Sequence, residues 1–163
     1  MLRLARLAAF ALALGAAPVA AQAAACGPTY GADGLAVGAD GGLWLTHYED
    51  ARLAYRTPDG RWHDRETLVA GKPVGLSGLR LDEERGVAWA VSADSTKIIR
   101  ISLRDGSANA TALDGVILHH RGPLPGDGAG GLWVLSAAAG ASWLEQPFLW
   151  HIGADGKVLE RKA

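Results

Sequence analysis

Apolar and polar positions alternate along three stretches of the chain, and glycine-led turns separate the alternating runs. In the first stretch the pattern predicts strands over residues 35–37, 43–47 and 52–56, and an outer strand that opens at 61–63. A period of two is typical of half-buried strands, and the Asp59-Gly60 pair favours a tight hairpin turn. The first stretch therefore predicts four short antiparallel strands.

The two later stretches repeat this plan. Strands are expected over residues 76–81, 86–92, 97–103 and 109–113, and again over 132–136, 148–152 and 158–161. The inner strand of the last stretch is expected within 122–127, where Pro123 and Pro125 are poor strand residues. After residue 25, no segment carries the pattern of a stable helix.

A tryptophan marks the same place in each stretch. Trp44, Trp89 and Trp133 each follow a glycine-led turn, 45 and then 44 residues apart, and an Asp-Gly pair follows each of them. Repeats of about 40–50 residues with four strands and an aromatic signature are typical of β-propeller blades. The tryptophans are expected to fill the space between neighbouring blades. We therefore predict an all-β fold of about three four-stranded antiparallel blades, over roughly residues 28–69, 70–113 and 114–163.

Residues 1–25 predict a secretory signal peptide rather than part of the fold. Arg3 and Arg6 precede an apolar run over residues 7–20, and Ala21-Gln22-Ala23 provides a small-residue cleavage site. A retained membrane anchor, the alternative, needs about 20 apolar residues, and this run is shorter. No other stretch approaches the length of a membrane span. We expect one domain over residues 26–163, exported to the periplasm or secreted.

Cys26 is the only cysteine, so no disulfide can form within the chain. It directly follows Ala23-Ala24-Ala25. This tripeptide resembles the one that precedes the lipidated cysteine of bacterial lipoproteins, but it lacks the usual leucine. Two interpretations stay open: a soluble exported protein with a lone thiol, or a protein anchored to lipid through Cys26.

The charge of the expected mature chain argues against nucleic-acid binding. Removal of Arg3 and Arg6 leaves 14 basic residues against 17 acidic ones, a formal charge of −3. No basic stripe remains that could follow a phosphate backbone. We therefore expect the partner to be another kind of ligand or a protein.

Residues 34–46, followed by 52–60, resemble a blade of the streptogramin (virginiamycin B) lyase group. The NHL-type and gluconolactonase-like propellers share the same succession of Asp-Gly, Leu-Trp and a later Asp-Gly. The resemblance extends over all three repeats and implies a propeller, a fold that usually closes with six or seven blades. This chain has three such repeats and so resembles half of a ring.

An open half-ring would leave two flanks with apolar sheet faces and strand edges exposed. Two chains could close a six-bladed ring by two-fold association, as a homodimer with contacts between the first and third blades. Alternatively, the chain could fold as an open half-ring or form part of a longer chain.

One end of the predicted propeller collects the loops that join second to third strands and one blade to the next. Histidines and carboxylates in these loops could together hold a divalent metal or act as an acid–base pair, although no fixed ligand spacing is present. The alternative is a set of solvated turns. The candidate residues of this end are His47, Glu49, Asp50, Asp94, His119, His120, Arg121, Trp143 and Glu145.

Two of these candidates carry a further expectation. Because neighbouring strand residues point to opposite faces, at most one of His119 and His120 would serve a common site. Trp143 lies in the longest loop and could cap a ligand, pin a partner or fold back on its own loop.

Two functions of different classes follow from these features. The first is an exported propeller module that binds an unidentified ligand or protein partner, without catalysis and without a cofactor. The second, implied by the resemblance, is a metal-assisted lyase or lactone hydrolase that acts across the loop-bearing end. Convergence of three or more of the candidate histidines and carboxylates on one point would favour the enzyme. Divergent side chains would favour the binding module.

Overall fold

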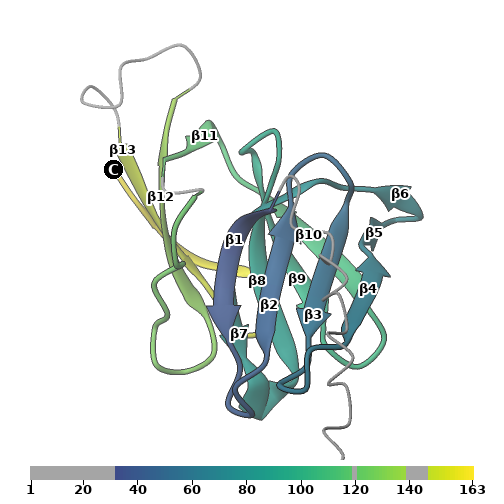
Figure 1. The fold of residues 1–163 in the computed structure, drawn as a ribbon. Coiled ribbons are helices and arrows are strands. Elements are labelled where there is room, and N and C mark those ends of the chain that lie inside the picture. Colours follow the sequence, from purple (N-terminus) through teal and green to yellow (C-terminus); the bar gives the residue numbers. More distant parts are fainter. Residues whose placement is uncertain (1–31, 119–120, 139–146) are drawn as a thin grey trace, which may run out of the picture.

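The computed structural model describes residues 32–118, 121–138 and 147–163, and these residues form an all-β fold (Figure 1). The one helical element among them is a short 3-10 turn, η1 (Glu83–Arg85). The expected signal peptide over residues 1–25 and Cys26 lie outside the described residues. No helix in the described ranges is long and apolar enough to cross a membrane.

The first sheet, blade one, contains four antiparallel strands in chain order. They are β1 (Ala32–Val37), β2 (Leu43–His47), β3 (Arg52–Arg56) and β4 (Trp62–Glu66). The strands predicted over 43–47 and 52–56 are confirmed residue for residue, because alternation and turn residues mark both ends. The inner strand begins three residues earlier than predicted.

The second sheet, blade two, has the same core of four strands and two additions. Its antiparallel strands are β7 (Leu76–Asp82), β8 (Val87–Ser92), β9 (Lys97–Ser102) and β10 (Ser107–Ala112). The segment that leaves blade one adds β5 (Leu68–Val69), which pairs in parallel with β10. It also adds β6 (Lys72–Pro73) at the sheet edge. The sheet therefore has six strands, where the repeat predicted four.

The third sheet, blade three, differs from the prediction at its inner strand. Its strands are β11 (Val116–Ile117), β12 (Leu132–Ala137), β13 (Pro147–Ile152) and β14 (Val158–Lys162). The inner strand was predicted within 122–127, but β11 occupies this place six residues earlier. Residues 122–127 contribute one isolated bridge, Gly126 to Leu132. Pro123 and Pro125 have no N–H to donate, so they cannot sustain a ladder here.

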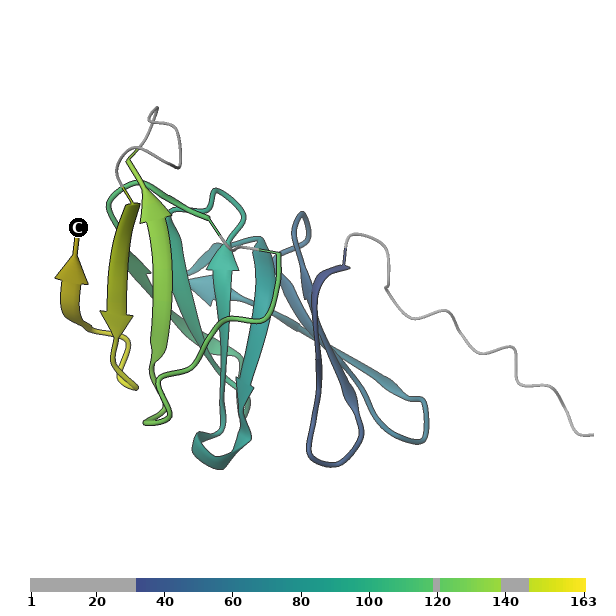
Figure 2. The same cartoon turned by 90° about the vertical axis from the view of Figure 1, so that its left-hand side faces the viewer.

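The three blades lie side by side, with blade two between the other two (Figure 2). Each blade carries its tryptophan on one face, which we call the forward face; the opposite face is the rear face. Backbone pairing aligns three rows on the forward faces: Trp44 with Tyr55 and His63, Trp89 with Arg100 and Asn109, and Trp133 with His151 and Glu160.

The hydrophobic core lies in two layers between the blades. One layer joins the forward face of blade one to the rear face of blade two, with Leu53, Leu79 and Ile99 in its buried cluster and Trp44 packed against it. The other joins blade two to blade three and centres on Trp89, which is 0% exposed. Each blade therefore depends on its neighbour for burial.

The two outer faces of the array are not covered by another of the three blades, although Leu45 and Ala54 on the rear face of blade one are buried (8% and 0% exposed). The rear face of blade one exposes Leu35 and Val37, and the forward face of blade three carries the partly exposed Trp133 and the exposed Leu149. Trp133 stacks on His151, with ring centroids 4.2 Å apart. Over the described residues the fold is thus an open row of three blades and not a closed ring.

Candidate functional site

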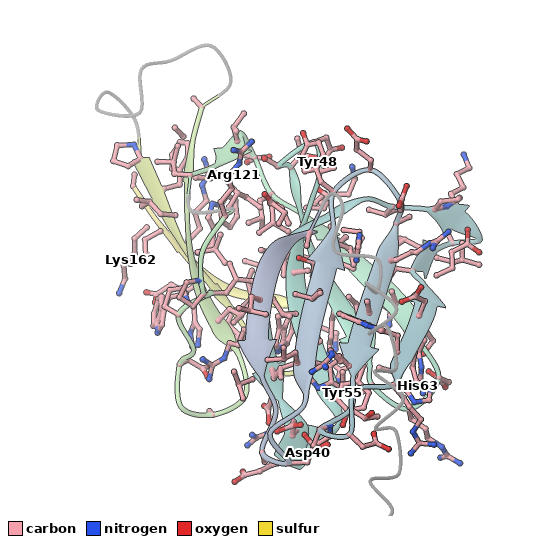
Figure 3. The ribbon with its side chains drawn as sticks, viewed as in Figure 1. Asp40, Tyr48, Tyr55, His63, Arg121 and Lys162 are labelled. Atoms are coloured by element: carbon pink, nitrogen blue, oxygen red, sulfur yellow. The ribbon has the colours of Figure 1, made fainter. Side chains whose placement is uncertain are left out.

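Four connections gather at one end of the blades, which we call the loop end. They are the β2–β3 turn, the β8–β9 turn, and the segments that lead into β7 and β11. Backbone hydrogen bonds tie them together: Ala93 N–H donates to the Gly75 carbonyl at 2.8 Å, and Ile117 N–H donates to the Ser95 carbonyl at 2.7 Å. Tyr48 and Arg121 mark this end in Figure 3, and Asp40 and Tyr55 mark the opposite end.

The β2–β3 turn divides its candidate residues between interior and surface. His47 is the last residue of β2, and its side chain is fully buried. Tyr48, Glu49 and Asp50 follow it and are exposed. The turn therefore offers an aromatic ring and two carboxylates to solvent, while the imidazole is enclosed.

Asp94 is committed to the β8–β9 turn. Its carboxylate accepts hydrogen bonds from the Thr96 hydroxyl at 2.8 Å, from the Lys97 ammonium at 2.8 Å and from Ser92 Oγ. Desolvation raises the pKa of the Asp94 carboxyl, but these hydrogen bonds outweigh it and hold the pKa well below the usual range. A metal ion at this carboxylate would have to displace the bonds that fix the turn.

Arg121 links blade three to blade one. Its Nε lies 3.9 Å from Oδ1 of Asp33, a residue of β1 whose side chain is mostly buried. The sequence prediction did not single out Asp33, because it precedes the predicted start of the inner strand. The Asp33-Gly34 pair directly precedes an apolar run, and this position could have indicated that Asp33 lies at the start of a strand.

The remaining candidates, His119, His120, Trp143 and Glu145, lie outside the described residues. Within the described ranges, no group of three or more histidine, cysteine or acidic side chains is placed to hold a metal ion. The described candidates therefore occupy separate positions at the loop end: one enclosed, one committed to its turn, and the others exposed.

Two hollows open at the loop end. One, of about 500 Å³, is lined by Leu118, Arg121, Gly122, Pro123 and Pro125. The other, of about 250 Å³, lies between the β6–β7 connection and the β8–β9 turn, and Asp94 and Lys97 are on its wall. The first has the volume of a small-molecule site, with the exposed Arg121 as its charged group.

A further hollow, of about 460 Å³, lies toward the opposite end of blade one. It is lined by Trp44, Leu53, Tyr55, His63, Asp64 and Arg65. The rings of Trp44 and Tyr55 on its wall pack against each other, with centroids 4.5 Å apart and ring planes tilted by 30°. The Tyr55 hydroxyl donates to Asp40, which raises the pKa of Tyr55 and lowers that of Asp40.

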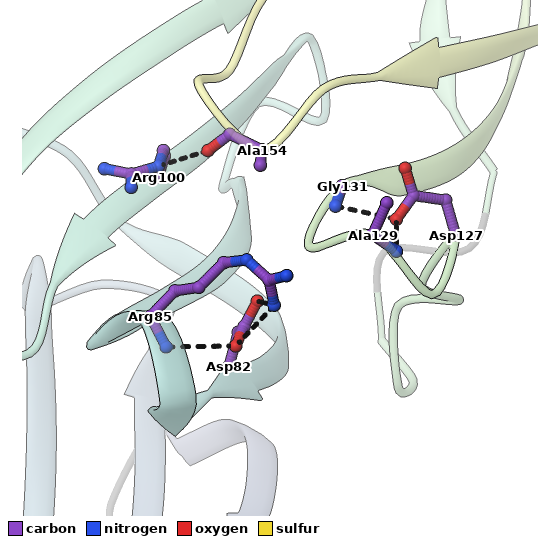
Figure 4. A network of polar contacts seen from close by, with 7 residues as sticks. All are labelled: Asp82, Arg85, Arg100, Asp127, Ala129, Gly131 and Ala154. Carbon is purple, nitrogen blue, oxygen red and sulfur yellow. Dashed lines mark hydrogen bonds and ion pairs between the residues drawn. The ribbon is translucent and has the colours of Figure 1, made fainter.

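Polar contacts at this opposite end fix turns of blades two and three, and one of them joins the two blades (Figure 4). Asp127 Oδ1 accepts from the N–H groups of Ala129 and Gly131, each at 2.8 Å. Its Oδ2 lies 2.8 Å from Nε2 of His151, and this hydrogen bond is the main cause that lowers the pKa of Asp127 to about 2. Arg100 Nε donates to the Ala154 carbonyl at 2.9 Å. The sequence prediction missed the two long-range contacts of this network, Asp127 with His151 and Arg100 with Ala154, which join residues 24 and 54 positions apart.

Comparison with solved structures shows the fold. Virginiamycin B lyase from Staphylococcus aureus has a TM-score of 0.59 and 18% sequence identity; the match covers 80% of this chain and 40% of the lyase. A catalytically inactive variant of that lyase, solved with quinupristin, has a TM-score of 0.57 and 20% identity, with the same coverage. A quinoprotein alcohol dehydrogenase-like protein from Bacteroides thetaiotaomicron has a TM-score of 0.57 and 18% identity, covering 78% of this chain and 32% of that protein.

These similarities identify the architecture as that of β-propeller blades. The chain spans about 40% or less of the length of these proteins. No protein-family model matches the chain, and no curated protein matches it in sequence. At such low identity the likeness extends to the fold and not to an activity.

Proposed function

We propose that the chain is an exported propeller module that binds a ligand or protein partner through its loop end, without catalysing a reaction. The observation that carries the proposal is the surface of this end. Connections between the blades meet there and present Tyr48, Glu49, Asp50 and Arg121 to solvent, and Arg121 also lines a hollow of about 500 Å³. Exposed aromatic and charged side chains on loops that a rigid scaffold positions are typical of recognition surfaces.

The state of the described candidates supports recognition rather than catalysis. The Asp94 carboxylate, kept ionised by its own turn, is a poor proton acceptor at neutral pH because its pKa lies far below the pH. The His47 ring is fully buried. The groups that face solvent are those that can pair with a partner's charges or pack on its apolar surface.

Export is part of the proposal and rests on the sequence of residues 1–25. The periplasm or the extracellular medium is the expected location, with attachment to lipid through Cys26 as the alternative. The mass of the N-terminal peptide of the protein isolated from its host would separate these two forms, because lipidation adds acyl chains to the cysteine.

A metal-assisted lyase is the second candidate function. It is favoured by the similarity of the blades to those of virginiamycin B lyase, including the variant solved with quinupristin. We therefore choose quinupristin as the probe, with and without Mg²⁺, and follow its conversion by liquid chromatography. We expect no conversion; conversion under either condition would overturn the non-catalytic proposal, and conversion that requires Mg²⁺ would support the metal-assisted lyase.

The binding part is tested by titrating the protein with quinupristin and mapping amide shifts by NMR. We expect the shifts to cluster at the loop end, and Arg121→Gln to weaken binding. Arg61→Gln is the matched control, because Arg61 is as exposed as Arg121 (74% and 72%) and also pairs with an aspartate, but lies in the β3–β4 turn at the opposite end. Shifts confined to that opposite end would contradict the proposed site, and absence of binding would remove quinupristin from the candidate ligands.

A further inference from the structure

The contacts between blades follow a rule that repeats within the chain. Two residues beyond the tryptophan row, the outer strand carries a side chain that donates to a turn of the next blade. In blade one, Arg65 Nη1 donates to the Leu103 carbonyl at 2.7 Å. In blade two, Thr111 Oγ1 donates to the Gly156 carbonyl. Each acceptor belongs to the Asp-Gly turn between the third and fourth strands of the following blade.

Blade three carries a donor at the same position. Lys162 lies two residues beyond Glu160, the outer-strand member of its tryptophan row, and directly opposite Leu149. In the structure its ammonium contacts Glu160 of its own strand at 3.0 Å. The forward face of blade three thus presents Trp133 and Lys162, as blade one presents Trp44 and Arg65 to blade two.

The rear face of blade one has the complementary features. Leu35 precedes Ala36 in the tryptophan row of blade one, just as Leu79 precedes Arg80 in that of blade two. Leu79 is 2% exposed because the forward face of blade one covers it, whereas Leu35 is 61% exposed. Leu35 thus lies, exposed, at the position that corresponds to Leu79, where the preceding blade packs on blade two.

The turn of blade one also offers the expected acceptors. The carbonyls equivalent to those of Leu103 and Gly156 belong to Thr57 and Gly60, counted from the shared Asp-Gly pair. Asp59 lies between them and is largely exposed, with Arg61 as its ion-pair partner. A lysine that approached this turn would meet carbonyl oxygens and a carboxylate, so the turn is complementary in charge to the ammonium of Lys162.

We infer that a second copy of this chain covers both open faces. The forward face of blade three packs on the rear face of blade one of the other copy, and the same contact forms a second time around a two-fold axis. Six blades then close a ring, with Trp133 against Leu35 and Lys162 at the turn of Asp59. The inference rests on the proposed binding module, because closure joins the loop ends of both copies into one continuous recognition surface.

The first test is the mass of the purified protein, measured by sedimentation equilibrium over a wide range of concentration. We expect the mass of two chains. Leu35→Glu should weaken association about a hundredfold or more, because it places a charge in an apolar contact. Leu68→Glu is the control: Leu68 is also exposed (39%) but lies in β5, away from both open faces, so this variant should remain a dimer.

A single chain at every concentration would overturn the inference, and so would a mass that keeps growing as concentration rises, since an open, non-closing contact would do that. Equal loss of association in Leu35→Glu and Leu68→Glu would also overturn it. Circular dichroism and thermal melts of each variant establish that the blades remain folded.

Mixing two variants tests which faces meet. Leu35→Glu damages only the rear face of blade one, and Trp133→Glu only the forward face of blade three. Each variant alone should be a single chain, and their mixture should regain the mass of two chains, because one of the two contacts is then intact on both sides. Failure to regain that mass while both variants are folded would exclude the head-to-tail pairing. Quinupristin binding by an unsubstituted protein that remains a single chain at every concentration would leave the proposed function standing and remove this inference alone.

Discussion

Trp89 and Trp133 occupy the same position in successive blades but have different surroundings. Both lie on the second strand, directly opposite the third-strand member of their row. Trp89 is fully enclosed by residues of blade three, including Leu132 and Trp150. Trp133 has a stacked imidazole on its own sheet and no further blade of the described chain beyond it. A repeat therefore specifies where a side chain points, whereas the neighbouring blade decides how much stability it supplies.

Replacement of these two tryptophans should give the largest difference in the free energy of unfolding between equivalent positions. We expect Trp89→Ala to lower the free energy of unfolding by roughly 3–5 kcal/mol, as for other buried aromatics. In the single chain, Trp133→Ala should cost about 1 kcal/mol, the value of a stacked aromatic pair. Urea melts at low protein concentration measure both. Equal losses would mean that the open face is covered in the single chain.

Gly34 and Leu35 sharpen the same comparison within one strand, because the two residues point to opposite faces. A Cβ on Gly34 would lie 2.6 Å from the carbonyl carbon of Gly78 in blade two, inside the covered interface. We expect Gly34→Ala to destabilise the fold by about 1–3 kcal/mol through overpacking. Leu35→Ala should change the stability of the single chain by less than about 0.5 kcal/mol. Thermal denaturation of both variants measures these changes in stability. A larger loss of stability in Leu35→Ala would reverse the assignment of the covered and exposed faces.

The donors of the outer strands give a smaller contrast. Arg65→Met keeps much of the side chain's length but removes the hydrogen bond to Leu103, so we expect a loss of about 1 kcal/mol. Lys162→Met, at the equivalent position of blade three, should leave the single chain nearly unchanged because its ion pair is exposed. Denaturant midpoints of the two variants at low concentration measure the difference. A cost at Lys162 that matches that at Arg65 would contradict this contrast.

The smallest expected effect concerns Asp127, which hydrogen-bonds to His151, the residue whose ring stacks on Trp133. The pKa of Asp127 is lowered to about 2, chiefly by its hydrogen bond with His151. The folded state therefore favours the carboxylate, and this stabilisation, fully present above about pH 4, is lost as the pH falls toward 2. Urea melts at a series of pH values should show that Asp127→Asn loses less free energy of unfolding than the unsubstituted protein as the pH falls from about 4 toward 2. Asp50→Asn, at an exposed carboxylate, is the control, and identical acid limbs in both variants would remove the role of Asp127.

Local pattern was enough to predict the second and third strands of each blade. The alternating side chains and the Asp-Gly turns lie within about ten residues of one another, so the sequence marks both ends of these hairpins. The inner strand of blade three was misplaced because its prolines interrupt the pattern, and the backbone instead pairs at Val116 and Ile117.

The burial and pairing of the residues at the candidate site could not be predicted from the sequence, because they depend on long-range contacts. The loop residues were predicted from their place between strands, but their individual states depend on distant partners. Arg121 pairs with a residue of another blade, 88 positions away. The burial of His47 likewise follows from the assembled fold and not from its neighbours in the chain. Asp94, by contrast, has the hydrogen-bond partners described above within three residues, and its Ser-Ala-Asp-Ser-Thr-Lys sequence could have indicated a self-contained turn.

Because β5 pairs in parallel with β10, the boundary between the first two sheets differs from the boundary between the first two sequence repeats. Blade two takes its outermost hydrogen-bonded strands from the segment that follows blade one, so the repeat boundary near residue 70 falls between the two halves of the β5–β6 hairpin. A gene fragment that encodes one repeat would consequently not encode one complete sheet. Duplication, deletion or recombination at that boundary would leave a bare edge on one product and a strand without a partner on the other. We therefore expect an exchanged segment to keep the six-stranded sheet intact only where it includes both the repeat and the short hairpin on its N-terminal side.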